Sequence, residues 1–181
     1  MIKVIFIPGN GGGTPKDNWF PYLKTELTKL EVAVIDKDFP DNIIAPEKSW
    51  IPFLHKLGAD ENTILIGHST GAIAAMRFAE EKKILGSVLV GTYHTDLGIE
   101  EEKQAGYFNR PWDWEAIMKN QKWIAQFNST DDPWIPIDEA RFVHEKLNTD
   151  YFESTNQGHF GGDYLKLEFP EVVEVIKKHI F

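Results

Sequence analysis

Short runs of aliphatic and β-branched residues alternate with segments of helical periodicity along the whole 181-residue chain. This alternation is typical of parallel strands joined by helices, and it predicts one α/β domain over residues 1–181. Several runs are almost entirely apolar, as in strands covered on both faces. Strands are expected at residues 3–7, 32–35, 63–66, 87–90, 123–127 and 149–153. Helices are expected at about residues 18–30, 46–57, 70–82, 136–147 and 163–180.

Residues 93–120 fit this rhythm worst, because the stretch is long and carries three consecutive glutamates. A long insertion after a strand can form a lid or a substrate wall. Its aromatics can equally pack onto the body of the domain, as buried aromatics commonly do. The candidate substrate-binding residues are Tyr107, Phe108 and Trp112 of this stretch, together with Trp134.

The charge balance and the absence of cysteine exclude several functions. With 28 acidic and 19 basic residues the formal charge is −9, which disfavours nucleic acid and anionic membranes as partners. Without cysteine there are no disulfides, thiolate metal sites or cysteine nucleophile. The first apolar run stops at Pro8, too early for a signal peptide, and no later run approaches a membrane span. We therefore expect a cytoplasmic protein.

The most specific motif is Gly67-His68-Ser69-Thr70-Gly71, a G-x-S-x-G sequence. It follows the apolar run 63–66 and precedes the helix-forming run 72–76, which is the context of a nucleophile elbow. Such a turn holds the serine hydroxyl above the end of the sheet and leaves no room for side chains at the two glycines. Ser69 is therefore the candidate nucleophile.

A serine hydroxyl needs a histidine base. His159 follows the last predicted strand within a glycine-containing loop, which suits a ring that folds back over the sheet. His94, at the start of the insertion, is the serious competitor, whereas His68 is held by the turn beside the serine. The other histidines lie in helical patterns, where a solvated or partly buried ring is ordinary: His55, His144 and His179.

The acid that orients the histidine should leave a strand between the serine and the histidine. Asp131 and Asp132 both qualify by spacing. Pro133 biases Asp132 toward extended geometry, which favours Asp132 as the acid and leaves Asp131 to stabilise the turn.

The oxyanion of an acyl-transfer reaction also needs backbone donors. The Thr70 amide, at a predicted helix N-terminus, and the Asn10 amide, in the glycine-rich loop after the first strand, are the candidate pair, with Gly11 next. The same loop imitates a dinucleotide-binding fingerprint, but Thr14 replaces the third glycine and Pro15 follows it. No cofactor is expected, and no histidine pair has metal-ligand spacing.

These motifs resemble the retinoblastoma-binding protein 9 and YdeN-like group of small serine hydrolases, in order and at similar spacing over nearly the whole chain. The resemblance implies a compact α/β-hydrolase fold with a mostly parallel central sheet, flanking helices and no large cap domain. It also supports Ser69, Asp132 and His159 as the catalytic triad. The segments that carry it are residues 8–13, 67–77, 106–112, 129–133 and 158–160.

One motif departs from the family. The vertebrate member carries an L-x-C-x-E sequence associated with retinoblastoma protein, whereas residues 57–61 here have Ala59 in place of the cysteine. Retinoblastoma-protein binding is therefore not expected. The sequence predicts hydrolysis of a small ester or amide through an acyl-enzyme on Ser69, and the alternative is a non-catalytic binding or regulatory protein on a hydrolase scaffold.

Overall fold

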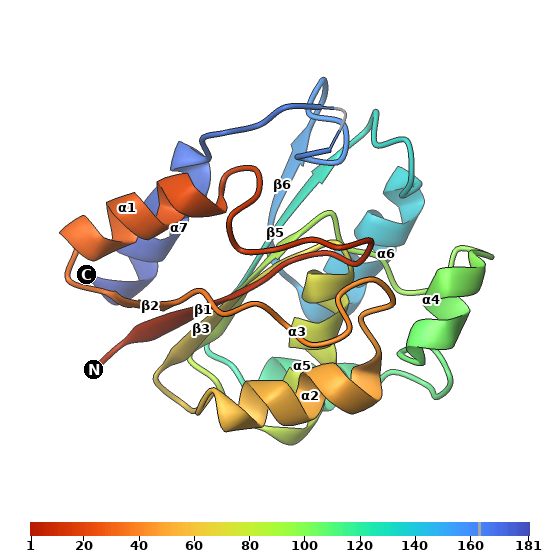
Figure 1. Ribbon diagram of the computed structural model, residues 1–181, viewed down its shortest axis with the longest axis horizontal. Coiled ribbons are helices and arrows are strands. Elements are labelled where there is room, and N and C mark those ends of the chain that lie inside the picture. The colour runs from red at the N-terminus through yellow and green to blue at the C-terminus, as the bar shows by residue number, and fades with distance from the viewer. Residues whose placement is uncertain (163) are drawn as a thin grey trace.

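The computed structural model describes residues 1–162 and 164–181. Its strands form one parallel sheet in the order β2-β1-β3-β4-β5-β6 (Figure 1). Since β2 and β3 lie on opposite sides of β1, the strand order reverses there, and a crevice forms at the carboxyl ends of β1 and β3. The strands are β1 (Lys3–Ile7), β2 (Ala33–Ile35), β3 (Thr63–His68), β4 (Gly86–Val90), β5 (Ile124–Ser129) and β6 (Asp150–Ser154).

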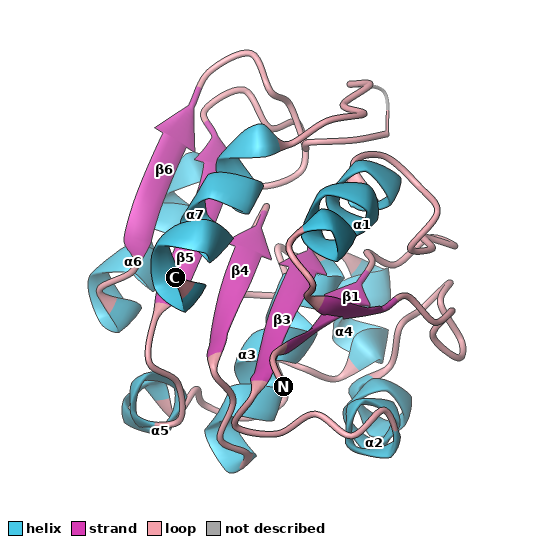
Figure 2. Ribbon diagram, turned by 90° about the vertical axis from the view of Figure 1, so that its left-hand side faces the viewer, coloured by secondary structure: helices cyan, strands magenta, loops and turns pink. Residues whose placement is uncertain are grey.

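Helices cover both faces of the sheet (Figure 2). One face carries α1 (Phe20–Lys29) and α7 (Pro170–Ile180), which pack together. The other carries α2 (Glu47–Lys56), α3 (Thr70–Glu81) and α6 (Ile137–Leu147). Among the described residues, no helix is long and apolar enough to cross a membrane.

The apolar runs are continuous because alternate residues of one strand face two separate cores. In β1, Val4 and Phe6 join the core under α1 and α7, whereas Ile5 and Ile7 join the core under α3, and all four are fully buried. A strand buried on both faces has no solvent-facing position, so it carries no polar alternation. The predicted α/β architecture is confirmed.

The expected strands are confirmed with ends shifted by at most two residues, and four of the five expected helices match closely. The prediction of a helix over 163–180 is wrong at its start, because the helix begins at Pro170. Phe169 precedes proline and has φ −143°, since the proline ring disfavours helical geometry at that residue. Residue 163 lies outside the described residues.

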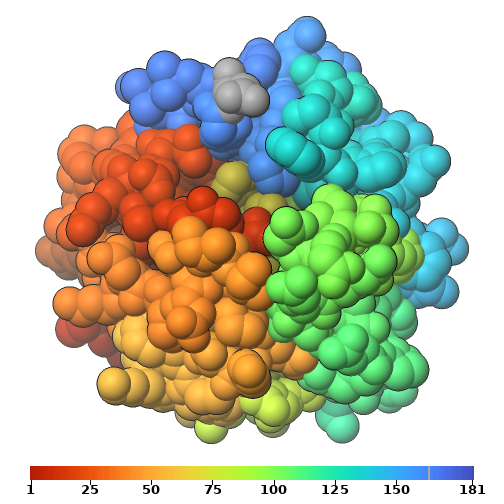
Figure 3. Space-filling view, turned by 45° about the vertical axis from the view of Figure 1, so that its right-hand side comes forward, coloured from red at the N-terminus to blue at the C-terminus, as the bar shows by residue number. Residues whose placement is uncertain are grey.

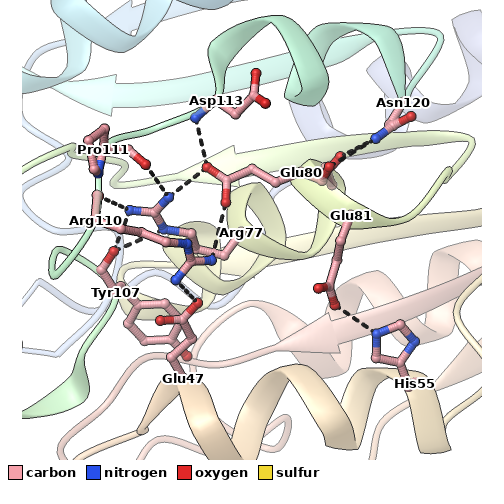
Figure 4. A network of polar contacts seen from close by, with 11 residues as sticks. Glu47, His55, Arg77, Glu80, Glu81, Tyr107, Arg110, Pro111, Asp113 and Asn120 are labelled. Atoms are coloured by element: carbon pink, nitrogen blue, oxygen red, sulfur yellow. Dashed lines mark hydrogen bonds and ion pairs between the residues drawn. The ribbon is translucent and has the colours of Figure 1, made fainter.

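The insertion of residues 93–120 contains two short helices, α4 (Glu100–Ala105) and α5 (Trp114–Lys119). Arg77 of α3 fixes the connection between them (Figure 4). Its buried guanidinium donates hydrogen bonds to the carbonyls of Tyr107, Arg110 and Pro111 and to Glu80. The insertion is therefore tied to the core helix that follows Ser69.

Candidate active site

Ser69 occupies the sharp turn between β3 and α3 and has φ 56° and ψ −124°. A non-glycine residue rarely adopts this conformation, and such strain concentrates at functional sites. Its amide donates to the carbonyl of Val90 on the neighbouring strand, and its carbonyl caps the first turn of α3. A Cβ at Gly67 would overlap backbone atoms of Gly71 across the turn, and one at Gly71 would overlap backbone atoms at the end of β1. The glycines of the motif thus have the steric role expected for a nucleophile elbow.

His159 and Asp132 lie next to each other at the carboxyl end of the sheet. His159 Nδ1 is 2.7 Å from Asp132 Oδ2. The other carboxylate oxygen of Asp132 accepts hydrogen bonds from the amides of Trp134 and Ile135, at 2.9 and 3.1 Å. Because the Asp132 side chain is almost completely buried and both oxygens are engaged, the imidazole is held in one orientation.

Asp131 has a different role from its neighbour. Its Oδ1 accepts hydrogen bonds from the Ser129 hydroxyl and from the amides of Gln157 and Gly158. These contacts lower the pKa of the Asp131 carboxyl, the Ser129 contact most. Asp131 therefore fastens the loop that carries His159 rather than contacting its ring.

His68, the residue before the serine, also supports His159. Its Nε2 lies 2.7 Å from the backbone carbonyl of His159, and the two rings pack with centroids 4.9 Å apart. Burial, followed by the neighbouring His159, lowers the pKa of His68 to about 3. A neutral His68 with its proton on Nε2 donates to that carbonyl.

A cavity of about 900 Å³ opens over these residues and is lined by both Ser69 and His159. The hollow is visible in Figure 3, where the loop after β1 meets the α4 segment and the loop between β6 and α7. The insertion contributes Leu97 and Ile99 to its wall. Among the described residues no hydrogen bond joins the Ser69 hydroxyl to the His159 ring, a contact that often tightens only when substrate binds.

The three candidate oxyanion donors differ in whether their amides are free. The Gly11 amide donates to the carbonyl of Ile43 at 2.9 Å, so it is already engaged. Within the described residues, the Asn10 and Thr70 amides have no acceptor. Asn10 also lines the cavity beside Ser69. Of the three candidate amides, those of Asn10 and Thr70 are therefore the two without an acceptor among the described residues.

Three of the four candidate substrate-binding aromatics do not line this cavity. Tyr107 is fully buried in the core. Phe108 and Trp112 border a separate hollow of about 410 Å³, and Trp112 lies over the Arg77 guanidinium at 3.6 Å. Only Trp134, which is largely exposed, lines the cavity with Ser69. Tyr107 thus lies in the core under α3, and Phe108 and Trp112 pack against that core.

His94, the competing base, lies in a different place. Its Nδ1 is 2.7 Å from Glu139 Oε2, and its ring stacks on Phe142 with centroids 4.0 Å apart. Burial would raise the pKa of Glu139, but hydrogen bonds from His94 and Thr95 outweigh it and lower that pKa to about 2. His94 is absent from the wall of the cavity that holds Ser69.

Some residues at the cavity were not identified from the sequence. A Cβ at Gly91 would lie 3.1 Å from the His159 ring, and one at Gly9 would lie 3.2 Å from Ser69 Cβ, so both glycines make room for the candidate residues. Gly91 directly follows an apolar strand, which was a usable signal. Glu102 lines the cavity although it belongs to a run of three glutamates, which usually marks a solvated surface. The described residues contain no cluster of three or more metal-ligating side chains.

Comparison with known proteins identifies the family of this chain. A sequence profile described as serine hydrolase matches residues 4–178. The chain belongs to the serine hydrolase family. It is 42% identical over 178 residues to the serine hydrolase RBBP9 of Rattus norvegicus, covering 97% of this chain and 94% of that protein. The YdeN protein of Bacillus subtilis (strain 168) is 25% identical over 189 residues, covering 99% of this chain and 97% of the relative.

A solved structure agrees with this assignment at the level of the fold. The crystal structure of the B. subtilis ydeN gene product matches with a TM-score of 0.89 and 24% identity, covering 99% of this chain and 98% of that chain. This serine hydrolase therefore has the compact α/β-hydrolase fold, and family membership makes it a hydrolase.

Proposed function

We propose that this serine hydrolase cleaves a small carboxylic ester or amide through an acyl-enzyme on Ser69. The observation that carries the proposal is the His159 ring, held by the buried Asp132 carboxylate, in the wall of the same cavity as a serine on a strained strand-to-helix turn. Nucleophile, base and orienting acid in this arrangement are the parts that serine acyl transfer requires.

The reaction proceeds in two halves. His159 accepts the Ser69 proton as the hydroxyl attacks the carbonyl carbon, while Asp132 holds the ring so that the nitrogen facing the serine is the base. The Asn10 and Thr70 amides stabilise the tetrahedral oxyanion. His159 then protonates the departing alcohol or amine. Water attacks the acyl-enzyme in the second half, with His159 as base again, and releases the acid from Ser69.

The cavity wall indicates the kind of substrate. Apolar side chains of Leu97, Ile99 and Trp134 face it, and its charged lining groups are all acidic, which favours a neutral substrate with an apolar acyl group over an anionic one. The proposed steps use only side chains and backbone amides of this chain. The cytoplasm is the compartment proposed from the sequence.

A covalent probe tests the nucleophile directly. Intact mass is measured after incubation with a fluorophosphonate, for wild type and for Ser69→Ala. We expect one adduct on wild type, formed as the serine oxygen displaces fluoride from phosphorus, and none on the variant. Steady-state hydrolysis of an activated ester should fall by several orders of magnitude in Ser69→Ala. Absence of both the adduct and turnover in folded wild type would instead favour a binding protein on a hydrolase scaffold.

A further inference from the structure

Glu102 is a buried carboxylate at the cavity wall for which the proposed reaction has no use. It lies on α4 within the insertion, is 5% exposed and lines the cavity with Ser69. Its helix neighbour Glu100 is exposed. A carboxylate is rarely buried without a partner, because removing it from water is costly unless other groups replace the hydration.

Three side chains from outside α4 replace that hydration. Asn10 Nδ2, from the loop after β1, donates to Glu102 Oε1 at 2.8 Å. The Thr70 hydroxyl, at the start of α3, donates to the same oxygen at 3.3 Å. The Tyr93 hydroxyl, just beyond β4, donates to Oε2 at 2.7 Å and lies 3.2 Å from the Thr70 hydroxyl. The three donors match the ionised carboxylate, which only accepts hydrogen bonds.

Two of these three partners are the residues whose backbone amides we propose as the oxyanion hole. Asn10 and Thr70 come from different segments, and the contacts of Glu102 join their side chains through one oxygen. An oxyanion hole works only when its donors are fixed close to the position where charge develops. The carboxylate therefore restrains both donor residues at once.

We propose that Glu102 is a positioning residue that clamps the Asn10 and Thr70 segments into an oxyanion hole, so that the insertion completes the active site. This inference rests on the proposed function. The inference assigns to α4 an indirect role in transition-state stabilisation. Glu102 acts through Asn10 and Thr70 and need not touch the substrate itself.

The main test compares Glu102→Gln with wild type. The amide replaces two ionised acceptor oxygens by one neutral oxygen, so the hydrogen bonds from Asn10 and Thr70 lose their charge assistance and Tyr93 can no longer donate at Oε2. The two segments are then held less tightly. We expect kcat for an activated ester to fall about 10- to 100-fold, less than the loss from deleting an oxyanion donor outright. KM should stay within about threefold, because the interaction is gained in the transition state. The rate constant of fluorophosphonate labelling should fall in parallel.

The matched control is Glu100→Gln, which removes the same charge from the same helix outside the cavity wall. It should leave kcat and KM at wild-type values. Thermal unfolding of each variant, with assays run well below its midpoint, separates positioning from loss of folded protein.

A second variant reaches the same clamp from its other side. Asn10→Ala removes the contact with Glu102 and keeps the Asn10 amide, so a fall in kcat at constant KM cannot come from a missing backbone donor. Combined with Glu102→Gln, its loss should be smaller than the product of the single losses, since both changes break one contact. Asn10→Ala carries the test alone if Glu102→Gln fails to fold.

The outcomes separate this inference from the proposed function. If Ser69→Ala abolishes labelling and turnover but Glu102→Gln and Asn10→Ala match wild type, the clamp is wrong and the function stands. A KM increase without loss of kcat, or fully multiplicative losses in the double variant, would also overturn the clamp. If Ser69→Ala retains activity, the proposed function is wrong, and the clamp, which rests on it, is wrong as well.

Discussion

The adjacent carboxylates of Asp131 and Asp132 accept hydrogen bonds from different groups. Asp132 contacts the His159 ring and two amides of its own turn, whereas Asp131 contacts amides of the loop that carries His159. The two residues thus divide two tasks: Asp132 orients the His159 ring, and Asp131 holds the loop that carries it.

Substituting the two aspartates separately should show this division. Asp132→Asn replaces the acceptor that selects the His159 tautomer, so kcat should fall by about 10³- to 10⁴-fold with the protein still folded. Asp131→Asn should lower kcat by about tenfold or less, while reducing thermal stability, because one acceptor of the loop amides is weakened. Steady-state kinetics and thermal unfolding of both variants check this. The reverse ranking of the two kcat values would show that the acid is Asp131.

At the scale of elements, the strand β3 and the helix α3 meet with no space at the two motif glycines. A Cβ at Gly67 would overlap the Gly71 carbonyl oxygen, and one at Gly71 would overlap the Ile7 carbonyl oxygen on β1. Backbone atoms cannot swing aside as a flexible side chain can. The elbow therefore depends on three elements packing at van der Waals distance.

Alanine at these glycines should destabilise the fold strongly. Gly67→Ala and Gly71→Ala should each cost more than about 3 kcal/mol of unfolding free energy, because overpacking moves backbone on both sides. Gly98→Ala is the control: Gly98 has φ +72° with open space around it, so only about 1 kcal/mol of conformational strain is expected. Urea denaturation measures all three, and similar costs would mean that close packing does not explain the motif.

Arg77 of α3 makes the largest set of hydrogen bonds that anchor the insertion, beside contacts from Glu80 and the carbonyl of Ala79. The planar guanidinium of Arg77 reaches three carbonyls and Glu80 together, which a lysine ammonium cannot do (Figure 4). Arg77→Lys should therefore lower stability by about 2–3 kcal/mol and increase amide hydrogen exchange in residues 107–119. Arg110→Lys, which alters exposed ion pairs, should cost less than about 1 kcal/mol. Unchanged exchange in Arg77→Lys would indicate that the insertion is held independently of α3.

For the molecule as a whole, the features that could be predicted from the sequence are those that depend on a local pattern of residues. The strands follow from apolar runs, and the elbow follows from two glycines around a serine between a strand and a helix. The start of α7 was predicted too early, because the apolar periodicity of the helix continues toward the N-terminus, before the proline at which the helix begins. The positions of Tyr107 and Glu102 could not be predicted, because contacts with Arg77 and Asn10 across the fold decide them.

The pH dependence of stability also belongs to the whole molecule, and it should be dominated near neutrality by His68. Its pKa is about 3 in the folded protein, against about 6.5 in an unfolded chain. The unfolded state therefore binds more protons between these values, so stability is complete above about pH 6.5 and is lost as pH falls toward 3. Glu139, with a folded pKa of about 2, adds to the loss only below about pH 4.5. The raised pKa of buried Glu102 acts in the opposite direction.

Unfolding free energies at pH 7, 6 and 5 test this assignment. In wild type the free energy should fall by up to about 1.4 kcal/mol per unit below pH 6.5, the limit for one proton taken up on unfolding. His68→Phe keeps an aromatic ring beside His159 but cannot titrate. The unfolding free energy of this variant should be lower than that of wild type at pH 7, and it should lose most of its dependence on pH. The comparison uses the slope because loss of the hydrogen bond to the His159 carbonyl lowers stability at every pH. An unchanged slope in His68→Phe would place the titrating group elsewhere.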